Sequence, residues 1–256
     1  MKKLYHFLLN KLPRPLLIKM SYIFAKFAPL LYKGNEVECP TCNHHFSKFL
    51  AYGTSVSRRE NVLCPSCLTL ERHRLMWLFL QEKTDFFTNK KKVLHIAPEQ
   101  CFYKRFRNQE NLDYTTGDLV SPLADIHFDL HNIPLNDNSY DVVICNHVLE
   151  HVDDDAQCMQ ELYRVMKPGG FGIFQVPIDS SRKTTYEDPS ITSEEEREKH
   201  FWQKDHVRLY GLDYGDKLAD AGFKMTLVDF PNEIGQELTS KYRLDPTEVI
   251  YFCEKV

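Results

Sequence analysis

The sequence lacks several features that would place it in a common class of protein. No acidic residue occurs in the first 34 positions, and the most apolar stretch, residues 16–32, is interrupted by Lys19 and Lys26, which argues against a membrane-spanning helix. Glycine is scarce, with 10 in 256 residues, and none occurs at 97–101, after the apolar run at 91–97. An NAD-dependent oxidoreductase would need a glycine-rich phosphate-binding loop there, so this class is disfavoured.

Cysteine is present, but without the pattern of a disulfide framework. Two Cys-x-x-Cys pairs account for four of the eight cysteines. The other four fall singly inside apolar patterns, as small buried residues do: Cys101, Cys145, Cys158 and Cys253. A reducing, cytoplasmic setting fits this usage.

The net charge of −4 conceals an uneven distribution of charge. Residues 1–34 carry seven Lys and Arg, whereas residues 76–256 carry 20 basic against 32 acidic residues. Nucleic-acid binding draws much of its affinity from phosphate contacts made by basic side chains. The acidic C-terminal region therefore argues against RNA or DNA as a partner.

Residues 1–34 are expected to form a basic, amphipathic helical arm. Pro13 and Pro15 divide it into two short helices, the second ending or kinking near Pro29. A signal peptide fits poorly, because the apolar run after Lys3 is short and lacks a small-residue cleavage site. Three partners stay open for residues 1–33: an anionic membrane surface, the rest of this chain, and another protein. Peripheral contact with the inner membrane surface is thus one expectation.

Residues 35–70 carry four cysteines with the spacing of a metal site. Cys39 and Cys42 form one knuckle and Cys64 and Cys67 the other, with 21 residues between them. Two such turns place four thiolates in the tetrahedral arrangement that suits zinc, and they leave no open position, so the ion is expected to be structural. The intervening segment predicts a hairpin with a loop near Gly53. The whole region is interpreted as a zinc-ribbon-like module.

A linking helix is predicted within residues 71–90. The amphipathic pattern that predicts this helix begins just before that range, at Leu68, and continues to Gln81. Arg72, His73 and Arg74 are assigned to its polar, solvated face.

The segment Ser139–Pro177 is the most informative part of the chain. An apolar run at 142–144 ends in four polar residues: Asn146, His147, Glu150 and His151. A helical period follows and stops at the Lys-Pro-Gly-Gly of 167–170, directly before a second apolar run at 171–176. Strand, turn, helix and strand make a βαβ unit, and ligands bind at the carboxyl ends of such strands.

The segment DVVICNHVLEHV, placed before LYRVMKPGG, resembles the fourth-strand region of class I S-adenosylmethionine (SAM)-dependent methyltransferases. The likeness extends over about residues 91–256, and HIAPE, TTYEDPSIT and DHVRLYGLDY look like a type 11-like bacterial branch. The resemblance implies a Rossmann-like, doubly wound α/β sheet of seven strands, with an antiparallel last strand beside the sixth. It also implies SAM as the cofactor.

The family's acidic-x-Gly-x-Gly-x-Gly loop after the first strand is altered in this sequence. His95 replaces the acid, and Ala97, Glu99 and Cys101 take the glycine positions, while Pro98 removes a backbone donor. The resemblance implies that Ala97 lies against the cofactor and that Glu99 binds the amino group of its methionine end. Capping of the following helix by Glu99 is the alternative.

Further cofactor contacts are implied at the ends of the other strands. Asp118, at the end of the second strand, would accept both ribose hydroxyls. Asp129 matches the acid near the adenine amino group, with Leu130 beside the base. Asn146 and His147 would face the methionine and sulfonium end.

The sequence His147-x-x-Glu150-His151 is similar to the Glu-x-x-Glu-His motif that binds magnesium in ubiquinone-pathway O-methyltransferases and small-RNA 2′-O-methyltransferases. Histidine at the first position disfavours magnesium, which prefers oxygen ligands. We therefore favour hydrogen bonding at a helix N-terminus for Glu150 and His151. His147, His206 and His151, in that order, are the candidate general bases.

The expected division is an arm at 1–34, the cysteine module at 35–70, the linking helix at 71–90, and a methyltransferase domain at 91–256. A charged insertion at about 179–205 is predicted to be a lid or substrate-binding segment. The leading hypothesis is a SAM-dependent methyltransferase acting on a small or membrane-associated molecule, such as a glycan or lipid-linked intermediate. RNA methylation and a non-catalytic scaffold role are the alternatives.

Overall fold

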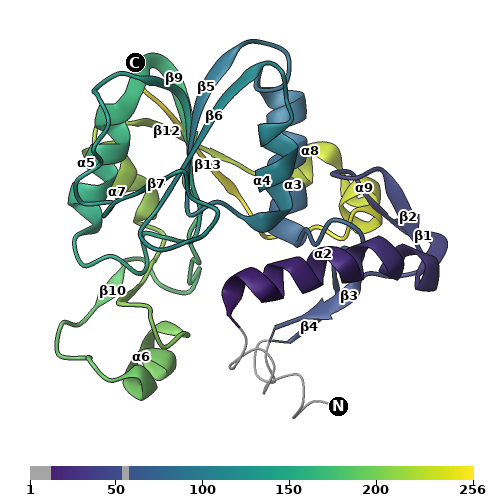
Figure 1. The fold of residues 1–256 in the computed structure, drawn as a ribbon. Coiled ribbons are helices and arrows are strands. Elements are labelled where there is room, and N and C mark those ends of the chain that lie inside the picture. Colours follow the sequence, from purple (N-terminus) through teal and green to yellow (C-terminus); the bar gives the residue numbers. More distant parts are fainter. Residues whose placement is uncertain (1–12, 54–57) are drawn as a thin grey trace. The chain divides into compact units, whose positions relative to one another are not determined.

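The structure is a computed structural model that describes residues 13–53 and 58–256 (Figure 1). The first of the two predicted arm helices lies outside these residues. The chain divides into two compact units: a cysteine unit, comprising Met1–Asp85 and Asp229–Glu248, and a sheet unit, comprising Phe86–Val228 and Val249–Val256. The sequence did not reveal that residues 229–248 group with the cysteine unit.

The sheet unit is built on seven strands in the order β12-β13-β9-β8-β5-β6-β7. Their bounds are β5 (Lys91–Ile96), β6 (Leu112–Asp118), β7 (Ile126–His127), β8 (Tyr140–Cys145), β9 (Met166–Ile173), β12 (Lys224–Val228) and β13 (Ile250–Glu254). Strands β5 to β9 pair in parallel, and β13 pairs antiparallel with both β9 and β12. The predicted Rossmann-like sheet with an inserted antiparallel last strand is thereby confirmed.

Helices cover both faces of this sheet, which makes it doubly wound. Helix α4 (Gln100–Arg107) lies on one side, and α5 (Asp155–Val165) and α7 (Tyr214–Asp220) lie on the other (Figure 1). Helix α5 buries Met159 and Leu162, which follow the predicted helical period. On the α4 side, the rings of Phe102 and Phe106 stack with their centroids 5.0 Å apart.

Helix α7 ends at a glycine. Gly222 has φ +106°, a left-handed conformation that glycine adopts without a steric penalty. Its amide donates to Ala219 O, and the amide of Phe223 donates to Leu218 O, which is the hydrogen-bond pattern of a Schellman cap. The chain is thereby turned into β12.

The predicted insertion holds three short elements. Strand β10 (Tyr186–Glu187) pairs antiparallel with β11 (Arg208–Leu209), and α6 (Glu194–Phe201) lies between them. Ser193 caps α6 by accepting a hydrogen bond from Glu196 N. The acidic run of this segment therefore forms most of a two-turn helix.

In its described part, residues 13–53, 58–85 and 229–248, the cysteine unit has two hairpins and four helices. The strands are β1 (Lys33–Cys39) paired with β2 (His44–Phe46), and β3 (Leu50–Tyr52) paired with β4 (Arg59–Leu63). The helices are α2 (Arg14–Leu31), α3 (Glu71–Lys83), α8 (Phe230–Ile234) and α9 (Gln236–Lys241). Helix α2 continues through Pro29 for two residues. None of the helices within the described residues has the length and apolar character needed to cross a membrane.

The assignment of Arg74 to a solvated face is wrong. Arg74 is fully buried, and His73 is 7% exposed. The Arg74 guanidinium donates to four backbone carbonyls, those of Val62, Thr69, Tyr242 and Arg243. It also lies 4.5 Å from the centroid of the Phe49 ring. Arg74 thus links the second hairpin to the returning segment 229–248.

Candidate functional site

The polar residues singled out in the sequence gather at the carboxyl edge of the parallel strands. They follow four strands in turn: Ala97 and Glu99 after β5, Asp118 at the end of β6, Asp129 after β7, and Asn146 and His147 after β8. Since β8, β5, β6 and β7 are consecutive neighbours, their ends form one row. Open α/β sheets bind ligands along this edge.

Glu99 lies at the centre of this row and is held by two side chains. Its Oε2 lies 2.5 Å from His95 Nε2, and its Oε1 accepts a hydrogen bond from Asn146 Nδ2 at 3.1 Å. Glu99 is also the N-cap residue of α4, without a side-chain capping hydrogen bond, so stabilisation of the helix by its charge stays the alternative. A carboxylate has about four acceptor sites, so it can still accept from a ligand ammonium group.

Tyr114 completes the chain of hydrogen bonds behind Glu99. Its hydroxyl lies 2.8 Å from His95 Nδ1. Burial, reinforced by the charge of Glu99, raises the pKa of Tyr114, so the phenol stays protonated. Because a carboxylate only accepts, the imidazole proton lies on Nε2, and Nδ1 accepts a hydrogen bond from the Tyr114 hydroxyl. His95 Nε2 is then the donor toward Glu99. His95, which replaces the family's acid, therefore positions a carboxylate four residues further along the chain.

Two residues at this edge hold left-handed backbone conformations. Ala97 has φ +48° and His147 has φ +54°. A left-handed backbone conformation costs a non-glycine residue about 1–2 kcal/mol of conformational free energy, and such strain concentrates at functional sites. Ala97 therefore keeps a glycine-like backbone at a position where the family has glycine.

Asp118 and Asp129 occupy the part of the row on β6 and β7. Asp118 Oδ1 accepts hydrogen bonds from Val120 N at 2.8 Å and Ser121 N at 2.7 Å, which fixes the carboxylate at the strand end. Asp129 is exposed, and hydrogen bonds from the amide and ring of His131 lower its pKa. Leu130 is 6% exposed and its side chain belongs to the apolar core.

His147, Glu150, His151 and His206 form a second polar group just beyond β8. His147 Nδ1 lies 3.4 Å from Glu150 Oε1, and the rings of His151 and His206 are 4.7 Å apart between centroids. Burial lowers the pKa of His206. Hydrogen bonding by Glu150 and His151 at the helix N-terminus, which we favoured, is wrong: α5 begins at Asp155, and Asp154 caps it by accepting from Gln157 N.

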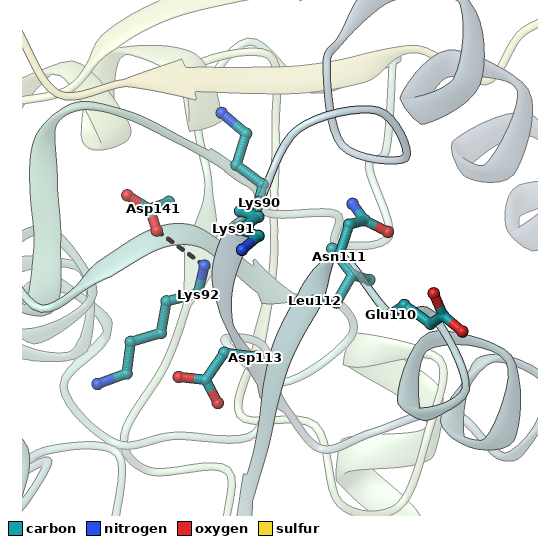
Figure 2. A pocket seen from close by; sticks show the side chains of 8 residues that line it. All are labelled: Lys90, Lys91, Lys92, Glu110, Asn111, Leu112, Asp113 and Asp141. Atoms are coloured by element: carbon teal, nitrogen blue, oxygen red, sulfur yellow. Dashed lines mark hydrogen bonds between the residues drawn. The ribbon is translucent and has the colours of Figure 1, made fainter.

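A distinct hollow of about 350 Å³ lies at the opposite edge of the sheet. It surrounds the amino ends of β5, β6 and β8 and is lined by Lys90, Lys91, Lys92, Glu110, Asn111, Leu112, Asp113 and Asp141 (Figure 2). Asp141 accepts from the backbone amide of Lys92 and from Lys167 Nζ there. This is the wrong edge for the ligand of an open α/β sheet, so we do not assign the functional site to it.

The four knuckle cysteines converge in the cysteine unit. Cys39 Sγ lies 3.5 Å from Cys67 Sγ, and Cys42 Sγ lies 3.7 Å from Cys64 Sγ. A tetrahedral site with Zn–S bonds of about 2.3 Å has sulfur atoms about 3.8 Å apart, so these residues fit a zinc ion. The four sulfur atoms all lie within 4.8 Å of one another.

Sequence reasoning missed the residues that support the site. Tyr114 and Gln175 carry no motif. Gln175 supports the site because its backbone N–H donates to Asn146 Oδ1 at 3.2 Å. Arg208 and Tyr210 are 2% and 0% exposed and donate hydrogen bonds to the segment that follows β8. The register of the strands brings these residues together, and no short-range spacing in the sequence encodes that register.

Comparison with known proteins agrees with this geometry. Residues 93–174 match the methyltransferase domain family. The matched segment, residues 93–174, is thus similar to a class I SAM-dependent methyltransferase domain. A curated relative from Mycolicibacterium smegmatis, named as a probable S-adenosylmethionine-dependent methyltransferase, is 44% identical over 57 residues, which cover 22% of each chain. A demethylmenaquinone methyltransferase of Staphylococcus epidermidis is 42% identical over 45 residues, covering 18% of this chain and 19% of that protein.

These matches are local. The chain spans about a fifth of the length of the curated relatives it matches. Among solved structures, the [4+2]-cyclase SpnF shares the fold over 93% of this chain and 96% of its own, with a TM-score of 0.51 and 11% identity. One fold hosts different chemistries, so the reaction of the methyltransferase domain has to be argued from its site.

Proposed function

We propose that this chain transfers a methyl group from SAM to a small or membrane-associated acceptor. The observation that carries the proposal is the row of polar residues on consecutive strand ends: Asn146, Glu99, Asp118 and Asp129. Strands lie about 4.8 Å apart, so the row is about 14 Å long. This length suits an extended nucleoside with an amino-acid tail.

The order of the row assigns each side chain a part of the cofactor. Glu99, fixed by His95 and Asn146, offers a carboxylate to the methionine ammonium group. Asp118 offers one to the ribose hydroxyls, and Asp129 offers one to the adenine amino group. These residues fit the cofactor although the glycine-rich loop is absent, because the left-handed turn at Ala97 keeps the β5 end in a glycine-like path.

SAM supplies a methyl group that its sulfonium charge already activates. The protein then has to orient the acceptor behind that methyl group and exclude water, and alignment supplies most of the rate advantage. His147 follows Asn146 at the β8 end, which supports a contact between its side chain and the acceptor in this proposal.

The membrane-associated part of the proposal rests on α2. This helix carries Lys19 and Lys26 but no acidic residue, and its exposed side includes seven large apolar side chains: Leu16, Met20, Ile23, Phe24, Phe27, Leu30 and Leu31. Such a surface suits the interface of an anionic membrane. We infer a cytoplasmic protein that contacts the inner membrane surface through this helix.

We also infer that the four knuckle cysteines hold one structural zinc ion. The sulfur separations support this, as does the position of Cys39 and Cys64, both fully buried, at the core of the hairpins. The ion would fix the cysteine unit, and it has no role in methyl transfer in this proposal.

The test is calorimetric titration of the full chain with SAM and with its demethylated product, together with thermal unfolding at millimolar ligand. We expect saturable heat at one site per chain and a raised melting temperature. Absence of both heat and thermal stabilisation would contradict the proposal and favour a scaffold protein with a methyltransferase-like fold.

A further inference from the structure

The segment that carries Asp129 follows the shortest strand of the sheet. Strand β7 has only two residues, lies at the edge of the sheet and pairs with β6 alone. So short an edge strand makes few backbone hydrogen bonds, and Asp129 lies two residues beyond its end. The position of the Asp129 carboxylate therefore has to be set by other contacts.

Helix α5 holds the residues that come next, 131–135, along one of its faces. Gln157 Nε2 donates to the carbonyl oxygen of His131 at 2.9 Å, and Glu161 Oε2 accepts from Ile133 N at 2.7 Å. Arg164 donates to the carbonyl oxygens of Ile133 and Leu135, each at 2.8 Å. The three helix residues are spaced four and three apart, so they share one face of α5. This part of the backbone is thereby fixed to the helix.

His131 connects the start of α5 to Asp129. Its Nε2 accepts a hydrogen bond from the backbone amide of Asp154, the N-cap residue, at 3.2 Å. Because a backbone amide only donates, Nε2 carries a lone pair and the imidazole proton lies on Nδ1. His131 Nδ1 lies 2.6 Å from Asp129 Oδ1 and therefore donates to it. The ring is thus held at both nitrogens.

One oxygen of the Asp129 carboxylate stays available. Oδ1 also accepts from the backbone amide of His131, at 3.0 Å, whereas Oδ2 bonds to none of the described residues. The side chain is 62% exposed. The two hydrogen bonds from His131 hold the pKa of Asp129 below its usual range, so the carboxylate is ionised at neutral pH. An ionised carboxylate oxygen only accepts, and it therefore fits an N–H group of a ligand.

We propose that His131 is a positioning residue that makes Asp129 selective for adenine over bases that lack the amino group. The inference rests on the proposed function, which places that amino group at Asp129. By engaging Oδ1, His131 restricts rotation of the carboxylate and leaves Oδ2 for the base. Hypoxanthine carries a carbonyl oxygen where adenine has its amino group, and this oxygen cannot donate to Oδ2.

The experiment is calorimetric titration of the full chain with S-adenosylhomocysteine, the demethylated product of SAM, and with S-inosylhomocysteine. The ratio of the two affinities measures the preference for adenine. In the wild-type chain we expect a preference of at least about tenfold, because one ligand leaves a charged acceptor without its donor.

Two variants separate the two bonds of the His131 ring. In His131→Gln the side-chain amide can reach the position of Nε2 and accept from Asp154 N, but it does not donate to Asp129. In His131→Asn the amide takes the position of Nδ1 and keeps the donor to Asp129. His131→Gln should lower the preference by at least about fivefold, whereas His131→Asn should keep it within about twofold. Asn132→Ala, an exposed neighbour, is the matched control.

The ratio distinguishes positioning from a general structural role. A merely structural His131 would change both affinities equally and leave their ratio unaltered. In an Asp129→Ala background, His131→Gln should cause no further change in the ratio, because its effect passes through Asp129. Circular dichroism checks folding, and His131→Phe, which also lacks the donor, replaces His131→Gln should that variant fail to fold.

Two results would overturn the role of His131 alone: binding of S-adenosylhomocysteine with the same preference in the wild-type chain and in His131→Gln, or a further fall of the ratio in the Asp129→Ala background. Absence of binding of both ligands to the wild-type chain would overturn the proposed function and this inference with it. The wild-type titration therefore separates the two failures.

Discussion

Asn146 and Glu99 are joined across the ends of two neighbouring strands, with Asn146 Nδ2 donating to Glu99 Oε1 at 3.1 Å. Strands β8 and β5, which precede these residues, are paired in parallel. His95 holds the other carboxylate oxygen. The negative charge that the family carries at the end of its first strand is thus present here, displaced to the start of the following helix.

Glu99→Gln is expected to weaken SAM binding by about tenfold or more, about 1.4 kcal/mol, because an amide does not attract the methionine ammonium group. Binding of 5′-methylthioadenosine, which lacks the amino-acid part, should be unchanged. Calorimetry with both ligands measures the difference. Glu110→Gln, at the opposite edge of the sheet, is the control. An equal loss for both ligands would contradict the assigned role of Glu99.

Asp118→Ala should weaken SAM and 5′-methylthioadenosine alike, each by about tenfold, because both ligands contain the ribose. The fold should persist, since the Asp118 side chain bonds only to the following turn among the described residues. Asp113→Ala, an exposed acid on the same strand, is the matched control. If Asp118→Ala bound SAM with unchanged affinity, the placement of the cofactor at this edge of the sheet would be contradicted.

Metal analysis of the purified chain should find zinc at the cysteine site, and Cys64→Ser should abolish it. The cysteine unit should then melt, because structural zinc contributes folding free energy directly. Cys101→Ser, a cysteine outside the cluster, should retain the zinc. A well-folded chain that is free of zinc would contradict this prediction.

Arg74→Met is expected to lower the free energy of unfolding of the cysteine unit by about 3 kcal/mol or more, since it leaves four carbonyls without their donor. Urea unfolding can be followed through Trp77, which lies on α3, in a Trp202→Phe background. Arg58→Met, an exposed arginine of the same unit, should change stability by less than about 0.5 kcal/mol. If Arg74→Met and the wild-type chain had equal free energies of unfolding, the four carbonyls would have found other donors, and the prediction would be contradicted.

Sedimentation with vesicles of phosphatidylcholine and phosphatidylglycerol tests the surface of α2. Reversal of both Lys19 and Lys26 to Glu should reduce binding by at least about tenfold, since each basic residue near an anionic surface contributes about 1 kcal/mol. Lys48→Glu, also in the cysteine unit, is the control. Binding that is unaffected by the double reversal or by added salt would exclude an electrostatic membrane contact.

Much of the sheet could be predicted because its strands are short apolar runs with clear boundaries. The run at 142–144 and the Pro-Gly stop after Val165 fix a βαβ unit locally, and Gly222 marks the end of α7. The resemblance then supplied the antiparallel last strand beside the sixth. Local periodicity also supported a solvated face for Arg74, and this was wrong because the residues that cover it, 242–243, are distant in the chain.

The candidate site could be predicted only in part for the same reason. Residues at strand ends are visible in the sequence, and Glu99, Asp118 and Asn146 were found in this way. The partnership of Glu150 with His206 depends on how the insertion returns to the sheet through Arg208. No spacing rule relates these segments, so the sequence suggested separate histidines where the structure has a cluster.

The return of residues 229–248 to the cysteine unit means that the polypeptide passes between its two units three times. Deleting everything before Phe86 would therefore not release a free methyltransferase domain. It would leave α8 and α9 in the middle of the remaining chain with the buried Phe230 exposed to water. The sheet unit therefore cannot be cut from the chain as one continuous segment without carrying part of the cysteine unit with it.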